Sequence, residues 1–219
     1  LFLVMIGITI AIVLNLFYDY EGQKQDLIRY MRETEDQLQI LLCELAAYLH
    51  NKDMEINVWD RIIAFEGRMH EFIKAAYDYQ DNTFHSHPGY YIDYFEMRLA
   101  QLQVLHNLHY EIKKIRKMPK QALVIADYIM YMADYVVEMN IPDQQIEKLE
   151  EISEQMKQEE LPKTREEFEG RALLYHILMD LEEFLVYKKR FVNGLDEKKL
   201  RIYWKQEMEQ KDSANELQK

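Results

Sequence analysis

The chain has 219 residues and carries 27 Lys and Arg against 39 Asp and Glu, which gives a formal charge of −12. Because nucleic acids and anionic lipid surfaces attract basic faces, this charge argues against tight binding to either, and we expect no nucleic-acid partner. The single cysteine, Cys43, excludes an intramolecular disulfide and a zinc site built from cysteines.

The first element along the chain is an uncharged run. Residues 1–17, LFLVMIGITIAIVLNLF, have Thr9 and Asn15 as their only polar side chains. At a rise of about 1.5 Å per residue, such a helix comes close to crossing a hydrocarbon layer about 30 Å thick. We therefore predict that residues 1–18 are the C-terminal part of a transmembrane helix and that the chain begins inside it.

A secretory signal and a buried core helix are the two alternatives for this run. A signal has a basic segment before its apolar core and small residues at a cleavage site after it, whereas nothing precedes Leu1 and Phe17, Tyr18 and Asp19 follow the core. A buried core helix is typically a shorter run of about 10 to 14 apolar residues. Both alternatives are less favoured than a membrane segment.

One face of the predicted membrane helix carries Gly7, Ala11 and Asn15, which are spaced by four and therefore stack on one side. Small residues followed by a polar one indicate close packing against another membrane helix rather than against lipid. Chance spacing, or an amide solvated at the membrane surface, would give the same pattern. We expect the partners of this face to be further membrane helices upstream in the same protein.

Six amphipathic segments follow, at about residues 26–50, 58–82, 90–117, 121–139, 143–160 and 164–192. Apolar residues recur in them at steps of three and four and almost nowhere at steps of two, so each predicts a helix and no strand is predicted. The segment at 121–139 is apolar nearly all round and is expected to be the most buried, while the sparse stripe of 143–160 predicts a helix on the outside. The predicted core stripes are Leu27, Met31, Leu38, Leu42, Leu45 and Leu49 in the first segment, Val58, Ile62, Phe65, Met69, Phe72, Ala76 and Tyr79 in the second, Phe95, Leu99, Leu102, Leu105, Ile112 and Ile115 in the third, Ile146, Leu149, Ile152 and Met156 in the fifth, and Leu174, Ile177, Leu181, Phe184 and Phe191 in the last.

Six glycines and four prolines punctuate these segments, a composition typical of long helices joined by short turns. Thr164 and Glu167 have the spacing of a capping box at the start of the last helix. We predict an all-α fold: an up-and-down antiparallel bundle of about five long helices over residues 24–195, preceded by the transmembrane helix. Residues 196–219 are expected to form a short helix and a frayed polar tail.

The histidines and serines give no pattern typical of an active site. A di-iron site in a helical bundle needs a Glu followed three residues later by a His, and no such pair occurs; Glu66 and His70 are four apart. His106 and His109 share a helix face and His85 and His87 share a turn, but neither pair has a third ligand at fixed spacing, and polar boundary residues are the simpler interpretation. Without a nucleophile motif or a phosphate loop, we expect no enzyme, no metal and no cofactor.

Sixteen tyrosines are an excess, and three of them, Tyr128, Tyr131 and Tyr135, lie within two turns of the segment predicted to be most buried. Phenol rings stack on planar ligands and their hydroxyls fix the orientation of a ligand, so these three are candidate ligand-binding residues. The alternative is that they fill gaps between helices, which is the more common use of aromatic stripes.

Two basic clusters, at residues 113–120 and 188–190, lie near predicted helix ends. Cations in the last turn of a helix complement its dipole, which is a purely structural use. Contact with lipid headgroups at the end of the bundle nearest the membrane is the functional alternative.

The run from Gly7 through Ala11 to Asn15-Leu-Phe17, followed by a long amphipathic helix, a charged all-helical domain and a capped final helix, resembles the end of proteins in the bacterial aromatic acid exporter family. In that family a membrane region of several helices is followed by a cytoplasmic helical domain of about this size. The sequence departs from the family where prolines are expected after Asn-Leu-Phe, since Tyr18, Asp19 and Tyr20 stand there.

The resemblance implies that this chain is the last membrane helix and the cytoplasmic domain of a transporter of aromatic or related organic acids. We expect the domain to act in assembly or gating, as a homo-oligomer in the cell membrane with the residues after about 18 in the cytoplasm. Lys24, Arg29 and Arg32 near the membrane run are consistent with that orientation. The alternative is a membrane-tethered helical interaction module without transport activity, in which the acidic bundle recruits a partner.

Overall fold

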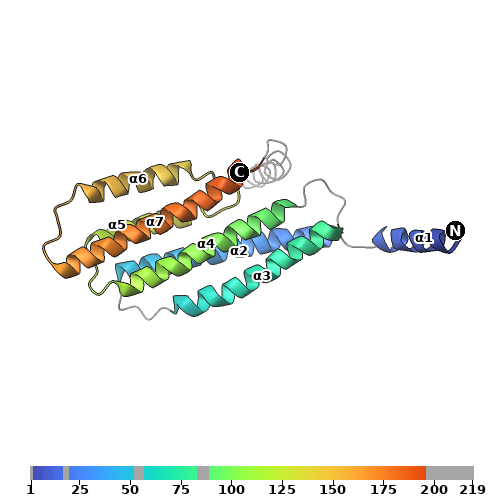
Figure 1. Cartoon of the computed structure of the whole chain (residues 1–219), viewed down its shortest axis with the longest axis horizontal. Coiled ribbons are helices and arrows are strands. Elements are labelled where there is room, and N and C mark those ends of the chain that lie inside the picture. The colour runs from blue at the N-terminus through green and yellow to red at the C-terminus, as the bar shows by residue number, and fades with distance from the viewer. Residues whose placement is uncertain (1, 17–19, 52–56, 83–88, 196–219) are drawn as a thin grey trace, which may run out of the picture.

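The protein is a long helical bundle (Figure 1). The structure, a computed structural model, describes residues 2–16, 20–51, 57–82 and 89–195, and within these ranges it contains seven helices and no strand. The all-α prediction is therefore confirmed. The helices are α1 (Phe2–Leu16), α2 (Tyr20–His50), α3 (Val58–Asn82), α4 (Gly89–Lys114), α5 (Gln121–Ala133), α6 (Asp143–Lys157) and α7 (Arg165–Asn193).

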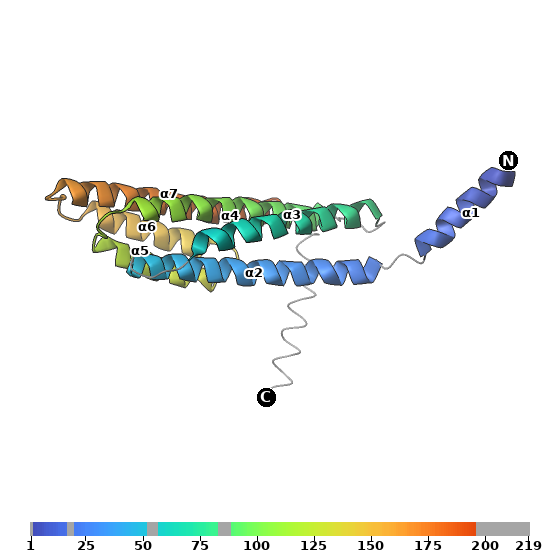
Figure 2. The same cartoon turned by 90° about the horizontal axis from the view of Figure 1, so that it is seen from below.

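From α2 to α7, consecutive helices run in alternating directions along the long axis of the molecule (Figures 1 and 2). Helix α2 packs against α3, α4 and α5, and α4 packs against α3 and α7. Helix α6 contacts α7 and α5 and lies on the outside of the other five. The arrangement is the predicted up-and-down bundle, which short connections between helices favour. The sparse apolar stripe of α6 faces inward.

The buried seams follow the helical period of the sequence closely. All seven residues of the predicted α3 stripe are buried, and so are the six of the α2 stripe and the five of the α7 stripe. Two predicted core residues, Leu99 and Ile146, are only partly buried against the core. A repeat of three and four residues places side chains on one face, and burial of that face provides most of the stability of such a bundle.

Helix α5 is shorter than predicted, because it ends at Ala133 and not near Met139. The next hydrogen bonds span three residues and not the four of an α-helix: the N–H of Tyr135 donates to Met132 O at 3.0 Å, and the N–H of Val136 donates to Ala133 O at 3.1 Å. The irregular segment that follows brings Glu138 into the bundle interior, where both its carboxylate and its carbonyl are bound by other helices. Tertiary contacts have therefore replaced the last turns of the predicted helix.

The start of α7 confirms the predicted cap. Thr164 Oγ1 accepts from the N–H of Glu167 at 3.1 Å, and Glu167 Oε2 accepts from the N–H of Lys163 at 2.9 Å, one residue earlier than in a standard capping box. Farther along, Gly170 allows α7 to approach the loop after α4, since a Cβ at this position would lie 2.9 Å from Cγ of Pro119. Close packing at both points anchors the beginning of α7.

Helix α1 differs from the other helices in its exposed apolar side chains. Its 15 residues are about 22 Å long, and none of the helices in the described part of the chain is long and apolar enough to cross a membrane. Its apolar side chains are exposed, from 42% at Ile6 to 83% at Leu3. Among the described residues, a Cβ added to Gly7 would meet no atom within 4 Å; the side chains of Ala11 and Asn15, like residues 196–219, lie outside the described part of the chain.

Candidate functional site

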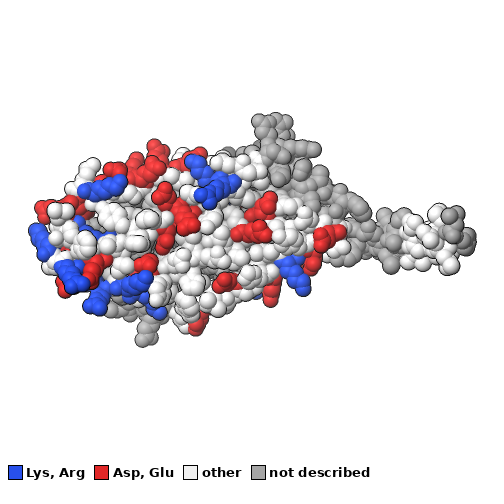
Figure 3. Space-filling view, in the orientation of Figure 1, with Lys and Arg blue, Asp and Glu red and all other residues white. Residues whose placement is uncertain are grey.

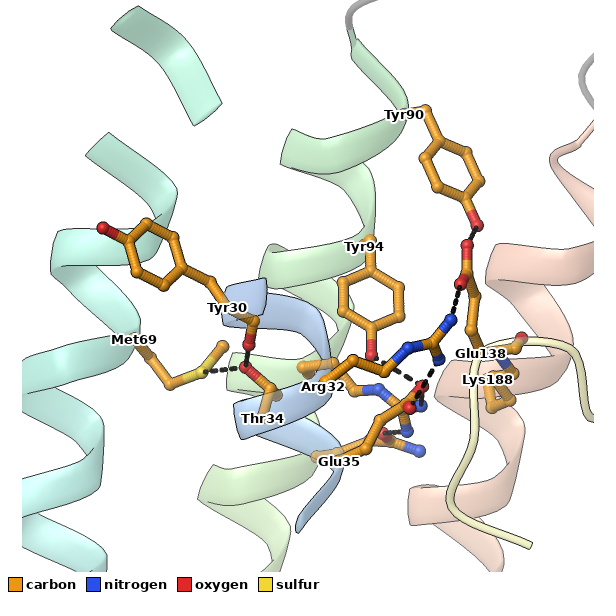
Figure 4. Close-up of polar contacts among 11 residues, drawn as sticks. Tyr30, Arg32, Thr34, Glu35, Met69, Tyr90, Tyr94, Glu138 and Lys188 are labelled. Atoms are coloured by element: carbon orange, nitrogen blue, oxygen red, sulfur yellow. Dashed lines mark hydrogen bonds and ion pairs between the residues drawn. The ribbon is translucent and has the colours of Figure 1, made fainter. Parts of the chain in front are cut away.

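A cluster of charged and polar side chains lies inside the bundle, and we call it the ionic cluster. Its members are Glu35 on α2, Arg98 and Gln101 on α4, Glu138 between α5 and α6, and Lys188 on α7, and each of them is at most 4% exposed. Figure 4 shows the labelled members converging with Arg32, Tyr90 and Tyr94. Burial of charged groups is costly unless they are paired, so such a cluster is a candidate functional site.

Three of the charged members occupy core positions of their helices. Glu35 lies four residues after Met31 and three before Leu38, and both neighbours are buried. In the same way Arg98 lies between Phe95 and Leu102, and Lys188 lies between Phe184 and Phe191, all of them buried. The helical period therefore directs these three charges inward, since residues three and four apart share a face.

The carboxylate of Glu35 joins α2 to α4. Its Oε1 accepts from the hydroxyl of Tyr94 at 3.1 Å and lies 3.5 Å from Arg98 Nη2, while its Oε2 accepts from Arg32 Nη1 at 2.9 Å. Arg98 also lies over the Tyr94 ring, at 5.1 Å, and its Nη1 donates to Gln101 Oε1 at 2.9 Å. These contacts satisfy most of the polar atoms on this side of the cluster.

Glu138 joins the α5–α6 connection to α2, α4 and α7. Its Oε1 accepts from the hydroxyl of Tyr90, its Oε2 lies 3.5 Å from Arg32 Nη2, and its backbone carbonyl accepts from Lys188 Nζ. On the other side, Gln101 Nε2 donates to the carbonyl of Phe184 in α7 at 2.8 Å. The ionic cluster therefore connects α2, α4, α7 and the α5–α6 connection through charge-assisted hydrogen bonds, which are the stronger kind.

Burial changes the proton affinities of this cluster. Loss of solvent, reinforced by repulsion from Arg98 and opposed by Glu35 and Glu138, holds the pKa of Lys188 well below its usual range. Burial also raises the pKa of Tyr94, which therefore keeps its proton and acts as a donor to Glu35. A network with this balance of charge depends on every partner staying in place, because a partly satisfied network is destabilising.

The three candidate ligand-binding tyrosines lie near one another but in different environments. Tyr128 is buried and donates to the carbonyl of Gln145 on α6 at 2.7 Å, and burial raises its pKa. Tyr131 has its ring 6.1 Å from that of Tyr128 and 4.9 Å from that of Tyr135, and Lys148 Nζ lies 3.7 Å from its centroid. Tyr128 thus joins α5 to α6, while Tyr135 is 38% exposed. Ligand binding by these residues stays a prediction.

The histidines do not assemble into a metal site in the part of the chain that the structure describes. His106 packs edge-on against Trp59, with 4.6 Å between ring centroids. His109 is buried, and its two ring nitrogens have no hydrogen-bond partner among the described residues. Burial, with repulsion from Lys113 and His106, lowers the pKa of His109, which keeps the ring neutral. His85 and His87 lie outside the described residues.

The two basic clusters lie in different surroundings. The one at residues 113–120 begins in the last turn of α4 and lies at the end of the bundle opposite the start of α2, where Lys and Arg gather on the visible face (Figures 1 and 3). Within it Lys114 Nζ pairs with Glu111 at 2.8 Å. In the other cluster Lys189 pairs with Asp143 at 2.9 Å, but Lys188 is in the core. Contact with lipid headgroups, the functional alternative for this cluster, does not apply to Lys188, because its position on the seam of α7 directs it inward.

Sequence reasoning missed the ionic cluster, although its signal is present. Charged residues at core spacing, three or four from apolar neighbours on both sides, mark Glu35, Arg98 and Lys188. Glu138 has no such signal, since it lies outside any helix.

Comparisons with known proteins agree with this architecture. A protein of Bacillus subtilis (strain 168), "Uncharacterized protein YqjA", is 27% identical over 191 residues, which cover 86% of this chain and 58% of the relative. The chain therefore spans little more than half the length of that relative. A solved structure, "Crystal structure of putative membrane protein from Clostridium difficile 630", matches with a TM-score of 0.69 over 76% of this chain and 97% of the other, at 23% identity, which shows a shared fold.

The family comparison covers most of the bundle. The sequence profile of the family described as "Putative aromatic acid exporter C-terminal domain" matches residues 24–189, from the first turns of α2 to the last turns of α7. All members of the ionic cluster lie within that range. The chain belongs to the aromatic acid exporter C-terminal domain family.

Proposed function

We propose that this chain is the cytoplasmic helical domain of a membrane transporter of the aromatic acid exporter type, held at the cell membrane by residues 1–18. The family match over residues 24–189 carries this proposal. Further support comes from α1, whose described side chains are exposed and, apart from Gly7 and Thr9, apolar. The hydroxyl of Thr9 donates to the backbone carbonyl of Met5, one turn earlier in the same helix. Such a surface is stable in lipid and unfavourable in water.

For the domain itself we infer a role in assembly or gating. Helix α2 follows directly after the predicted membrane segment, and its residue Glu35 lies about 22 Å along the helix from Tyr20. A shift of α2 along its axis would separate Glu35 from Tyr94 and Arg98 on α4, which links the membrane side to the interior of the bundle. Gating through such a link requires two arrangements that differ in these contacts.

Assembly is supported by the outer face of α5. Leu123, Val124 and Met130 are 44 to 48% exposed there, although a helix on the surface of a monomer usually presents polar residues outward. Apolar side chains grouped on one exposed helix are typical of contacts between copies of a chain. We expect a homo-oligomer in which α5 takes part, with the upstream membrane helices as the other partners.

The test is deletion of residues 24–219 from the complete gene product. We expect the truncated protein to reach the membrane but to lose its oligomeric state on gel filtration, its export of aromatic acids from loaded cells, or both. A matched control carries Leu123, Val124 and Met130 replaced by Ser in the complete protein, which should affect the oligomer alone. The proposal fails if truncation leaves oligomer and export unchanged.

A simpler observation separates transport from a tether. We expect the gene upstream of the Leu1 codon to encode several uncharged runs of about 20 residues, each able to span a membrane. A gene with no such runs would favour the alternative, a membrane-tethered interaction module.

A further inference from the structure

We propose that a small cavity beside the ionic cluster binds one monovalent anion of about the size of chloride, between Arg98 of α4 and Lys188 of α7. The site is independent of the transport proposal, because it rests on the interior of the bundle alone.

The lining of the cavity has the chemistry of an anion site. Two buried basic side chains, Arg98 and Lys188, line it together with the amide side chains of Gln101, Asn140 and Gln145. No Asp or Glu is among the described residues that line it; the others are Met132, Tyr135, Val136, Pro142, Phe184 and Leu185. Cationic and amide N–H groups with apolar walls stabilise a negative charge and offer little to a cation.

Arg98 has a donor left over at this site. Its Nη1 donates to Gln101, but its Nε and Nη2, both buried, have no hydrogen-bond partner in the part of the chain that the structure describes; Nη2 is 3.5 Å from Glu35 Oε1 as an ion pair. An arginine with 1% exposure and an unsatisfied N–H is costly, because a buried charged donor loses its water without compensation. Arg98 lines the cavity, and an anion placed there within reach of its unsatisfied N–H groups would accept from them and remove that cost.

The size of the cavity selects the ligand. Its free volume is about 10 Å³, which is room for one body about the size of a water molecule. A chloride ion is somewhat larger than water and enters only if the lining moves outward slightly, whereas a phosphate or an aromatic carboxylate would need a much larger rearrangement. Water would also fit, but water brings no charge to two neighbouring cations.

Binding would couple α4 to α7. Burial lowers the pKa of Lys188 most, and repulsion from Arg98 adds to that effect. An anion between the two side chains offsets the repulsion and therefore favours the charged ammonium that donates to the carbonyl of Glu138. The charged groups that act on Lys188 are Arg98 on α4, Glu35 on α2 and Glu138 in the α5–α6 connection, and Glu138 is also paired with Arg32 of α2. The anion thus stabilises the arrangement in which all these elements are joined.

The test is thermal unfolding of the whole chain in detergent, followed by circular dichroism at pH 7. Sodium chloride replaces sodium gluconate at constant ionic strength, so that screening does not change while a bulky anion gives way to a small one. We expect the Tm to rise by about 3 °C and to saturate, and bromide to act like chloride. Equal Tm values in chloride and gluconate would overturn the proposal in favour of a bound water.

Variants place the effect in the cavity. Lys188→Met removes one cation of the site and should abolish the response, while Lys189→Met, a matched change of the neighbouring surface residue, should keep it. Should Lys188→Met not fold, Gln101→Glu serves instead, because a carboxylate beside Arg98 supplies the charge of the anion and should give a Tm that no longer depends on chloride. A response that persists in the variant would overturn the assignment to this cavity.

Discussion

Two halves of one core are built on different principles. Around Glu35, Arg98 and Lys188 the interior is charged and each group depends on a specific partner. Toward the C-terminal end of α2 the interior is aliphatic, and its side chains are at most 1% exposed: Leu41, Leu42, Leu45, Leu49, Ile62, Leu105, Leu108 and Ile112. The aliphatic half stabilises the bundle in proportion to the area it buries, whereas the ionic half adds little net stability, because the attraction between its charges is offset by the cost of removing them from water.

That difference locates the part of the molecule suited to a change of state. Aliphatic side chains in a packed interior have no specific bonding partners that they could exchange. Carboxylates shared between helices can instead form ion pairs with other charged groups if one helix moves. Arg32, half exposed at the edge of the ionic half, already contacts both Glu35 and Glu138. The ionic half is therefore where we expect motion of α2 to be felt.

The largest expected effect comes from breaking the ionic half. Glu35→Ala leaves Arg98 buried without its carboxylate, and we expect it to lower the free energy of unfolding by about 3–5 kcal/mol, measured by urea titration. Replacing both partners, as Glu35→Met with Arg98→Met, removes the unpaired charge and should recover most of that loss. A double variant no more stable than Glu35→Ala would show that the pair contributes through something other than its charges.

A cavity in the aliphatic half should act in proportion to the volume removed. Leu45→Ala is expected to lower the free energy of unfolding by about 3 kcal/mol, since Leu45 is fully buried. Leu45→Met keeps the volume and should cost less than about 1.5 kcal/mol. The loss for Leu45→Ala should be the same in chloride and gluconate, and a dependence on the anion would contradict the separation of the two halves.

The smallest expected effect concerns Asp180, a partly buried carboxyl on α7 outside the ionic cluster. Burial, followed by repulsion from Glu111 and Glu183 and opposed by His176, raises its pKa from an ordinary 3.8 to about 6. A raised carboxyl pKa means that its contribution to stability is present below about pH 4 and is lost as the pH rises through 6.

Asp180→Asn should therefore stabilise the protein by about 1 kcal/mol at pH 7.5, because a tenfold change in proton affinity corresponds to about 1.4 kcal/mol and solvent screens a partly exposed group. At pH 4 the variant and the natural chain should unfold at nearly equal urea concentrations. Glu182→Gln, an exposed carboxyl two residues away, is the control and should change little at either pH. A gain that is equal at both pH values would contradict the assigned cause.

The helical period of apolar residues is what allowed the helices and their buried faces to be predicted from the sequence. The stripe from Val58 to Tyr79 marks the buried face of α3, and the cap at Thr164 marks the start of α7. The end of α5 was predicted about six residues too late, because Gln121 to Met139 is apolar nearly all round and its last turns are opened by contacts from other helices. The pattern of a local segment contains no information about side chains on other helices that compete for its backbone and side-chain contacts.

The sequence by itself determined which face of each helix turns inward, including the faces that carry Glu35, Arg98 and Lys188, since periodicity is a property of each helix alone. Only the tertiary structure decided which of these charges meet, because their pairing requires α4 to pack against both α2 and α7. It also decided that Glu138 closes the network from an irregular connection and that Arg98 borders a cavity. Charges separated by tens of residues become partners through the fold, and no local rule states their distances.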